Sequence, residues 1–315
     1  MTHLRNLGSS CVCLLTLLLF GCATTPVAAP SPSAEPADDA NAAIAATVPS
    51  TDIVMIRLAP LLAGEAVPAA TVVTQRRGYD NQPSFSPDGR SVWFSSISDD
   101  QQADVFRYDM ASGRIARVTQ TAESEYSPTP LGGGAFSCIQ VALDGTQRLW
   151  RYTDGVPEAA IRADITGVGY HAWLRPEMLA LFIVDEPMRL ETVTLDGAPP
   201  RTVATNIGRS LHRTSRGTLA YVQKDADGRG TLLEYDPESN AGRLRAKLPV
   251  DGEDLVWLAD GSALIANGRS IYRLPSAGSS WQELGDLTRS VAGDISRMAV
   301  SPNGEWLALV IAESE

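Results

Sequence analysis

Short stretches in which apolar and polar residues alternate recur along most of the chain, and a turn separates each from the next. Residues 91–96 (SVWFSS) and 104–109 (DVFRYD) are two of them, and the first follows the turn Ser86-Pro87-Asp88-Gly89. Alternation with a period of two residues is typical of strands with one buried face, and Asp-Gly supplies the positive φ that a tight hairpin needs. Stretches with helical periodicity are few. The pattern therefore predicts an all-β domain.

The turns recur at a nearly constant interval. They lie at positions 89, 133, 177, 217, 261 and 304, so successive turns are 40 to 44 residues apart. Two further strand-like segments belong to each repeat, as 104–109 and 114–119 do in the first one. Four strands in about 43 residues is the content of one blade of a β-propeller. We therefore expect a six-bladed β-propeller of four-stranded blades.

The last repeat contains only two strands, 298–300 and 306–311, and two further strand-like segments, 52–57 and 70–74, precede the first repeat. An open ring would expose unpaired strand edges. We therefore expect the N-terminal strands to complete the last blade and close the ring. The expected blades are 79–121, 122–161, 162–204, 205–248, 249–287, and 288–315 together with 51–76.

The first 21 residues resemble a bacterial lipoprotein signal peptide. Arg5 precedes an apolar run at 11–20, which is too short to span a bilayer as a helix but has the length of a signal-peptide core. The run ends in LFGC at 19–22, which resembles the lipobox that precedes a lipidated cysteine. This resemblance implies that Cys22 carries a diacylglycerol and an amide-linked acyl chain such as palmitate. An ordinary cleaved signal peptide is the alternative.

Residues 22–50 are expected to form a tether that begins at the lipidated Cys22. Ala, Pro, Ser and Thr dominate the segment and large apolar residues are nearly absent, so it cannot offset the entropy of folding. A flexible chain of about 28 residues reaches on the order of 30 Å. Position 23 is Ala rather than Asp, which in lipoproteins implies sorting to the outer membrane. We therefore expect the domain at 51–315 to be held at the periplasmic face of that membrane.

The composition excludes several classes of function. The formal charge is −11, with 26 Lys and Arg against 37 Asp and Glu, and the basic residues form no patch, which excludes nucleic-acid binding. Of the four cysteines only Cys138 lies beyond residue 22, so the body of the chain cannot form a disulfide framework or a zinc cluster. Its flanking residues read as a strand, which predicts a buried structural thiol.

Polar or acidic residues lie just before the first strand of each expected blade. In a propeller these positions approach the axis from one face, so we expect them to form a mostly acidic funnel at the mouth of the central channel. Such a funnel would bind a basic peptide, an amine or a cation, and simple solvation of the channel mouth is the alternative. The candidate binding residues are Asp80, Asn81, Glu125, Tyr126, Tyr170, His171, His212, Glu253, Asp254 and Arg297.

No motif in the sequence indicates catalysis or a bound cofactor. The chain has no Gly-x-Ser-x-Gly elbow, phosphate-binding loop or dinucleotide fingerprint. His171 and His212 are one position out of phase, which predicts that they face opposite sides of their strands and share no metal. Residues 225–228 (DADG) resemble the start of a calcium loop but lack the closing Glu, so a hairpin turn is expected there. We expect no catalytic residue, no metal site and no cofactor besides the lipid on Cys22.

One stretch resembles a known repeat. Residues 81–89 (NQPSFSPDG), followed by VWFS at 92–95 and DVFRYD at 104–109, resemble the TolB-type propeller repeat, and the resemblance extends over 52–315. It implies a rigid six-bladed disc with a polar central channel that grips proteins or peptides. TolB also has an N-terminal α/β domain that this sequence lacks, so a role in the Tol–Pal machinery does not follow from the resemblance.

Three functions remain open at this point. The leading expectation is a monomeric, lipid-anchored binding or scaffold module for a protein or peptide of the cell envelope. The alternatives are a propeller enzyme, such as a lyase or hydrolase of sugars or lactones, and a sensor of a small ligand. An enzyme of this kind would need histidine and carboxylate groups that converge at the axis. Whether His171, His212, Glu125 and Asp254 lie together therefore discriminates between binding and catalysis.

Overall fold

The computed structural model describes residues 50–97, 102–250 and 252–312. The predictions for the signal peptide, for Cys22 and for nearly all of the tether lie outside these residues. Within them the chain forms β-strands and one short helix, α2 (Leu58–Leu62). No helix in the described part is long and apolar enough to cross a membrane.

Four separate antiparallel sheets account for the middle of the chain, and each has four strands in the order of a meander. The first contains β7 (Ser124–Gly132), β8 (Ala135–Val141), β9 (Gln147–Thr153) and β10 (Val156–Ala160). The second contains β11 (Val168–Arg175), β12 (Met178–Ile183), β13 (Arg189–Thr194) and β14 (Arg201–Thr205). The third contains β15 (Ile207–Arg213), β16 (Leu219–Lys224), β17 (Gly230–Asp236) and β18 (Ala241–Lys247). The fourth contains β19 (Leu255–Trp257), β20 (Ala263–Asn267), β21 (Ser270–Leu274) and β22 (Gln282–Asp286).

The two ends of the domain share a larger sheet. It contains β1 (Thr51–Arg57), β2 (Thr71–Val72), β3 (Tyr79–Phe85), β4 (Ser91–Ile97), β5 (Ala103–Asp109), β6 (Ile115–Arg117), β23 (Ile295–Val300) and β24 (Trp306–Ala312). β1 pairs with β24 in antiparallel register over seven residue pairs, and β2 pairs with β1. The only pair that joins β1 to β3 is Thr51 with Tyr79. The sheet therefore consists of two four-stranded groups, β23-β24-β1-β2 and β3-β4-β5-β6, whose strand pairing is joined by one bridge and whose side chains pack together.

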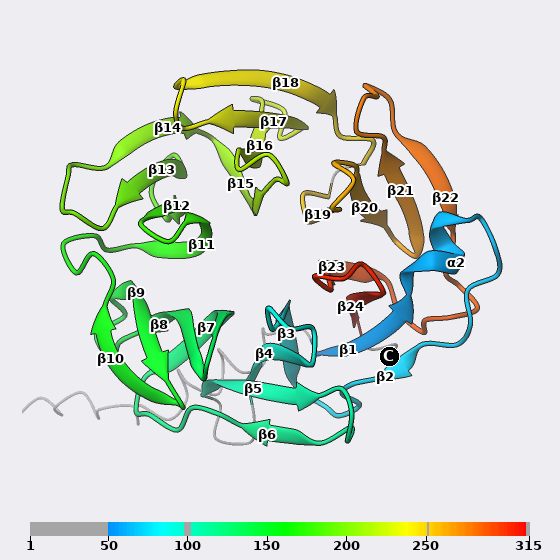
Figure 1. Cartoon of the computed structure of the whole chain (residues 1–315), viewed down its shortest axis with the longest axis horizontal. Helices are drawn as coiled ribbons and strands as arrows, with labels where there is room; N and C mark the ends of the chain where they lie inside the picture. Colours follow the sequence, from blue (N-terminus) through cyan, green and yellow to red (C-terminus); the bar gives the residue numbers. More distant parts are fainter. Residues whose placement is uncertain (1–49, 98–101, 251, 313–315) are drawn as a thin grey trace, which may run out of the picture. The chain divides into compact units, whose positions relative to one another are not determined.

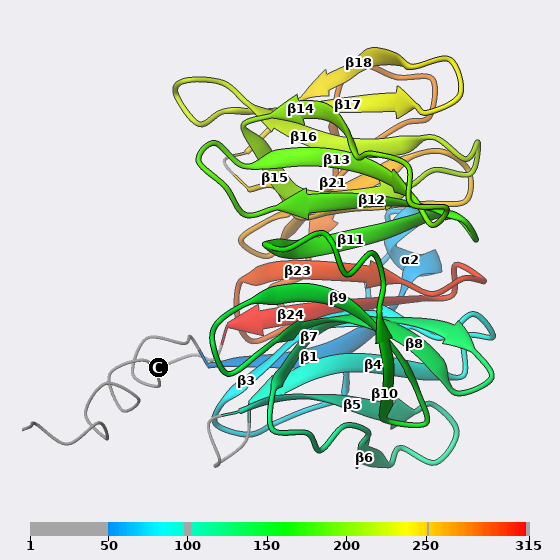
Figure 2. The same ribbon diagram turned by 90° about the vertical axis from the view of Figure 1, so that its left-hand side faces the viewer.

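The sheets are arranged around a common centre, which β3, β7, β11, β15, β19 and β23 approach most closely (Figure 1). Seen from the side, the strands of neighbouring sheets lie in successive layers (Figure 2). Four-stranded antiparallel sheets in this arrangement make the architecture all-β and of the β-propeller type. The turns predicted between the first and second strands are present: Gly89 and Gly304 both have φ of 69°, as the hairpins β3–β4 and β23–β24 require.

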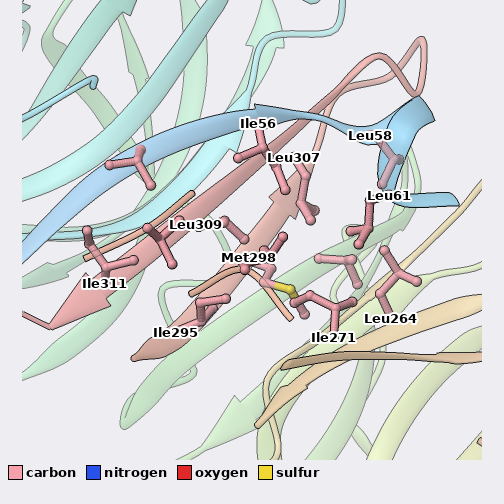
Figure 3. Packing of buried hydrophobic residues seen from close by; sticks show 14 of the residues in the cluster. Ile56, Leu58, Leu61, Leu264, Ile271, Ile295, Met298, Leu307, Leu309 and Ile311 are labelled. Atoms are coloured by element: carbon pink, nitrogen blue, oxygen red, sulfur yellow. The ribbon is translucent and has the colours of Figure 1, made fainter. Parts of the chain in front are cut away.

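The apolar core lies between neighbouring sheets, and β1 is buried on both of its faces. Ile53 and Met55 belong to a cluster with Phe94 of β4, whereas Val54 and Ile56 face the opposite way. Successive side chains of a strand point to opposite faces, so a strand between two cores needs an unbroken apolar run. Figure 3 shows the second of these clusters, which brings together Ile56, Leu58, Leu61, Leu264, Ile271, Ile295, Met298, Leu307, Leu309 and Ile311.

Candidate functional site

A cavity of about 300 Å³ is bounded by the innermost strands of all the sheets. Irregular backbone is frequent in these strands: the register shifts in β3, β7, β11, β15 and β23. Gln82 of β3 and Ser127 of β7 have positive φ values of 58° and 53°. Bulges of this kind re-aim side chains away from strict alternation. The cavity is lined by Gln82–Phe85, Ser127–Thr129, Tyr170, His171, Arg209–His212, Asp254–Trp257, Arg297–Val300 and Pro302.

Ion pairs hold the acidic groups of the cavity. Arg209 of β15 donates from Nε to Asp254 Oδ2 at 3.0 Å, and its Nη2 contacts the same oxygen. Glu253, one residue earlier, lies 3.7 Å from Arg209 Nε and 2.9 Å from Lys224 Nζ. Burial lowers the pKa of Arg209, but the hydrogen bond and charge of Asp254 outweigh this and raise it. Both carboxylates are therefore neutralised by cations of the same domain.

Arg297 of β23 is the least satisfied charge in the cavity. Its Nε lies 3.7 Å from Asp254 Oδ1, and its Nη2 donates to Tyr170 Oη at 3.4 Å. The guanidinium also lies over the Tyr170 ring, 5.2 Å from its centre. The side chain is only 15% exposed, so these long contacts replace water poorly. With Arg209 and Arg297 against Asp254, the ionised groups that line the cavity carry one excess positive charge.

His171 and His212 both line the cavity, although the sequence predicts that they face opposite sides of their strands. The register shifts in β11 and β15 account for the difference, because each breaks the strict alternation on which the prediction rested. His171 Nε2 is 2.8 Å from Ser137 Oγ, and His212 Nε2 is 3.1 Å from Ser210 Oγ. Burial lowers the pKa of each imidazole to about 4, so both rings are neutral near pH 7.

Two of the predicted acidic residues lie in the interior instead of the channel. Asp80 is fully buried and forms an ion pair with Arg76, whose Nη2 is 2.6 Å from Asp80 Oδ1. Glu125 is also fully buried, accepts a hydrogen bond from Tyr152 Oη at 3.1 Å, and has its pKa raised by burial. Because neither lines the cavity and the remaining acids are paired, the expected acidic funnel is corrected to a site of mixed charge with a cationic excess.

The other expected residues divide between the cavity and its surroundings. Tyr170, His171, His212, Asp254 and Arg297 line it, and Glu253 lines an adjoining pocket with Arg209 and Lys224. Asn81 is largely buried, and its Oδ1 accepts a hydrogen bond from the backbone N–H of Gln82. Tyr126 packs against the cluster that contains Ile139 and Leu149. Sequence reasoning missed Arg209, which like Arg297 lies in the first half of the innermost strand of its sheet.

Two predictions of a purely structural role are confirmed. Cys138 is free and fully buried, and burial raises the pKa of its thiol, so it is a structural thiol and no nucleophile. Asp225 Oδ1 accepts from the backbone N–H groups of Asp227 and Arg229 at 3.0 and 2.9 Å, as in a hairpin turn. Among the described residues no group of three or more His, Cys, Asp or Glu could hold a metal ion.

No family model matches this chain, and no curated protein does. Solved structures do match. A TolB-type protein from Agrobacterium tumefaciens has a TM-score of 0.65 at 11% identity, with 85% of this chain and 100% of that chain covered. The gluconolactonase XC5397 from Xanthomonas campestris has a TM-score of 0.59 at 14% identity, with 84% and 97% covered. The oligogalacturonate lyase from Vibrio parahaemolyticus has a TM-score of 0.53 at 14% identity, with 77% and 80% covered. The chain therefore has a TolB-like propeller fold, and at these identities the likeness concerns the fold alone.

Proposed function

We propose that this chain is a six-bladed β-propeller, closed by β1 and β2, that acts as a binding or scaffold module of the bacterial cell envelope. Its site is the central cavity, and the partner is a protein or peptide that presents an anionic group. The sequence favoured a basic partner, but that expectation depended on free carboxylates. Because Asp254 and Glu253 are in ion pairs, the net charge that a ligand would contact in the cavity is the positive charge of an arginine.

The weak pairing of Arg297 is the observation that carries this proposal. Arg297 is nearly buried, and no charged partner among the described residues lies closer to it than Asp254 at 3.7 Å. Its desolvation is therefore offset by no short ion pair. A carboxylate group entering the cavity would supply short charge-assisted hydrogen bonds. Arg209 is fixed by Asp254, and Tyr170 lies beside Arg297, so the site is arranged before the partner arrives.

Binding is favoured over catalysis by the placement of the four groups that discriminate between them. His171, His212 and Asp254 line the cavity, but Glu125 lies outside the lining and Asp254 is held by Arg209. A general base has to be free to take a proton from a substrate within hydrogen-bond reach. Of the three groups that line the cavity only the two imidazoles lack an ionic partner, so neither Glu125 nor Asp254 offers them the free carboxylate that such an enzyme would need.

A photoreactive amino acid at position 299 would test the site, because Ala299 lines the cavity. We expect a discrete crosslinked partner in intact cells, and none from position 244, which is on the exposed outer strand β18. Arg297→Gln should lower the crosslink yield about tenfold, since a lost charge-assisted hydrogen bond costs about 1.5–3 kcal/mol. Arg57→Gln removes an exposed arginine elsewhere and serves as the matched control. Equal yields from the two variants would contradict the proposal.

Anchoring through Cys22 is the second part of the proposal and rests on the lipobox-like LFGC at 19–22. We expect the lipidated chain to be held at the periplasmic face of the outer membrane. Several acyl chains, each buried CH₂ contributing about 0.8 kcal/mol, make such an anchor effectively permanent. Cys22→Ser should therefore release the domain into the soluble fraction. Persistence of the variant in washed membranes would show that the lipobox interpretation is wrong.

An enzyme remains the second candidate because two neutral imidazoles line the cavity. Proteins of the same fold include a gluconolactonase and an oligogalacturonate lyase. If the chain is an enzyme, assays with lactones and with oligogalacturonates should show turnover that His171→Gln and His212→Gln abolish. If it is a binding module, these variants leave the crosslink at position 299 in place.

A further inference from the structure

Three arginines converge on one buried carboxylate in the sheet β15–β18, away from the central cavity. Glu234 of β17 is 3% exposed, and its oxygens accept from Arg216 Nη2 at 2.6 and 2.7 Å. Arg243 donates to it from Nε at 3.1 Å and from Nη2 at 2.6 Å, and Arg245 from Nη1 at 3.1 Å. Arginines that look scattered in the sequence are thus gathered by the strand pairing of one blade.

This arginine cluster (Arg216, Arg243 and Arg245 around Glu234) has a net charge of +2. Burial alone raises the pKa of Glu234, but hydrogen bonds from Thr218 and the three arginines outweigh it and lower the pKa to about 2. The carboxylate is therefore ionised at any physiological pH and offsets one of three positive charges. The neighbouring ion pair of Arg273 with Asp260 is balanced and leaves this excess unchanged.

The three arginines have different surroundings. Arg245 is 6% exposed, donates from Nη2 to the carbonyl oxygen of Ser276 at 2.8 Å, and lies over the Trp257 ring. It is a structural member of the cluster. Arg216 and Arg243 are more than half exposed, at 55% and 54%. Glu234 holds one side of each guanidinium, so the other side faces outward.

The outward side carries donors that have no hydrogen-bond acceptor among the described residues. These are Nε and Nη1 of Arg216 and Nη1 of Arg243. Fixing a long arginine side chain normally costs conformational entropy when a ligand binds. Here Glu234 fixes both guanidiniums beforehand, so a ligand would gain their hydrogen bonds without that cost.

We propose that Arg216 and Arg243 form a binding site for a phosphate monoester. The charge argument favours this ligand over a carboxylate: the cluster has an excess of two positive charges, and a phosphate monoester carries about −1.5 to −2 at neutral pH. The remaining donors agree with this, because the N–H groups of two planar guanidiniums held on one carboxylate can donate to different oxygens of one phosphate. The phosphate belongs to a soluble ester or to a lipid headgroup, and the chemistry at the two arginines is the same.

Titration with inorganic phosphate at constant ionic strength tests the site, with the full-length chain carrying Cys22→Ser as the reference protein. We expect saturable binding that Arg216→Gln/Arg243→Gln weakens about tenfold or more, since the variant loses the charge-assisted hydrogen bonds of both guanidiniums. The control Arg201→Gln/Arg229→Gln removes two exposed charges elsewhere and should change the affinity less than about twofold.

A second variant keeps the test valid if the protein with Arg216→Gln/Arg243→Gln does not fold. Arg216→Lys/Arg243→Lys retains both charges, so Glu234 stays paired, but it removes the planar forks. The proposal predicts a loss of affinity of about fivefold or more in this variant, whereas diffuse attraction to positive charge would leave the affinity unchanged. Absence of saturable phosphate binding to the reference protein, or unchanged binding in both variants, would overturn the proposal.

Vesicles distinguish the two sources of the phosphate. Phosphatidylcholine vesicles that contain phosphatidic acid present a phosphate monoester, and those that contain phosphatidylglycerol present only a diester. Recruitment to the first kind alone, lost in Arg216→Gln/Arg243→Gln, would identify a lipid headgroup as the ligand. Phosphate binding in solution without recruitment to either kind would identify a soluble ester.

Discussion

Deleting residues 51–76 is expected to abolish folding of the domain. The deletion removes β1, which pairs with β24 over its whole length, and exposes the apolar clusters on both of its faces. Ile53, Val54, Met55 and Ile56 are each at most 5% exposed. Burying one such side chain contributes about 1.5–3 kcal/mol, so the four together approach the entire 5–15 kcal/mol that stabilises a typical domain.

Deletion of residues 24–48 is the matched control. Its sequence is rich in Ala, Pro and Ser, so its loss should leave the melting temperature within about 2 °C of the parent. Circular dichroism during heating measures the melting temperatures of both deletion variants. Equal melting temperatures would show that β1 does not close the ring and would contradict the proposed six-bladed closure, which places 51–76 in the last blade.

The sequence predicts strands well where turn chemistry and alternation agree. The hairpins at Gly89 and Gly304 have the expected backbone, because Asp-Gly and Asn-Gly determine a tight turn locally. The segment 52–57 is observed as β1, and its unbroken apolar run fits a strand buried on both faces. The helix α2 was not predicted, because five residues are too few to show a period.

The candidate site was harder to predict because its geometry depends on contacts distant in sequence. Arg209 and Asp254 are 45 residues apart, and nothing local indicates that they form an ion pair. The assignment of Asp80 and Glu125 to the channel placed them just before the first strands, whereas they lie within β3 and β7 and both side chains are fully buried. Bulges in the innermost strands decide which side chains enter the cavity, and a bulge has no clear signal in alternating polarity.

The second large effect is expected from Glu234→Gln, which should destabilise the domain by about 3 kcal/mol at pH 7. The pKa of Glu234 is lowered from 4.5 to about 2, and a difference of one pKa unit corresponds to about 1.36 kcal/mol. The neutral amide removes the counter-charge of Arg216, Arg243 and Arg245, and the loss of this interaction is what the lowered pKa measures. Glu158→Gln is the control, because Glu158 forms an exposed pair with Arg151, and such pairs contribute less than about 1 kcal/mol.

The pH dependence separates this charge effect from a change in packing. A carboxyl group whose pKa is lowered by folding stabilises the folded state fully above its unfolded pKa, and the stabilisation is lost as the pH falls through the folded pKa. For Glu234 the stabilisation is therefore lost as the pH falls from 4.5, the ordinary pKa, to about 2, the pKa in the folded state. The free energies of unfolding in urea of the parent and of Glu234→Gln should therefore differ most above pH 5 and converge toward pH 2. A difference that stays constant over this range would mean that the three arginines do not stabilise the ionised form of Glu234, because only the loss of an ionised carboxylate makes the two proteins converge in acid.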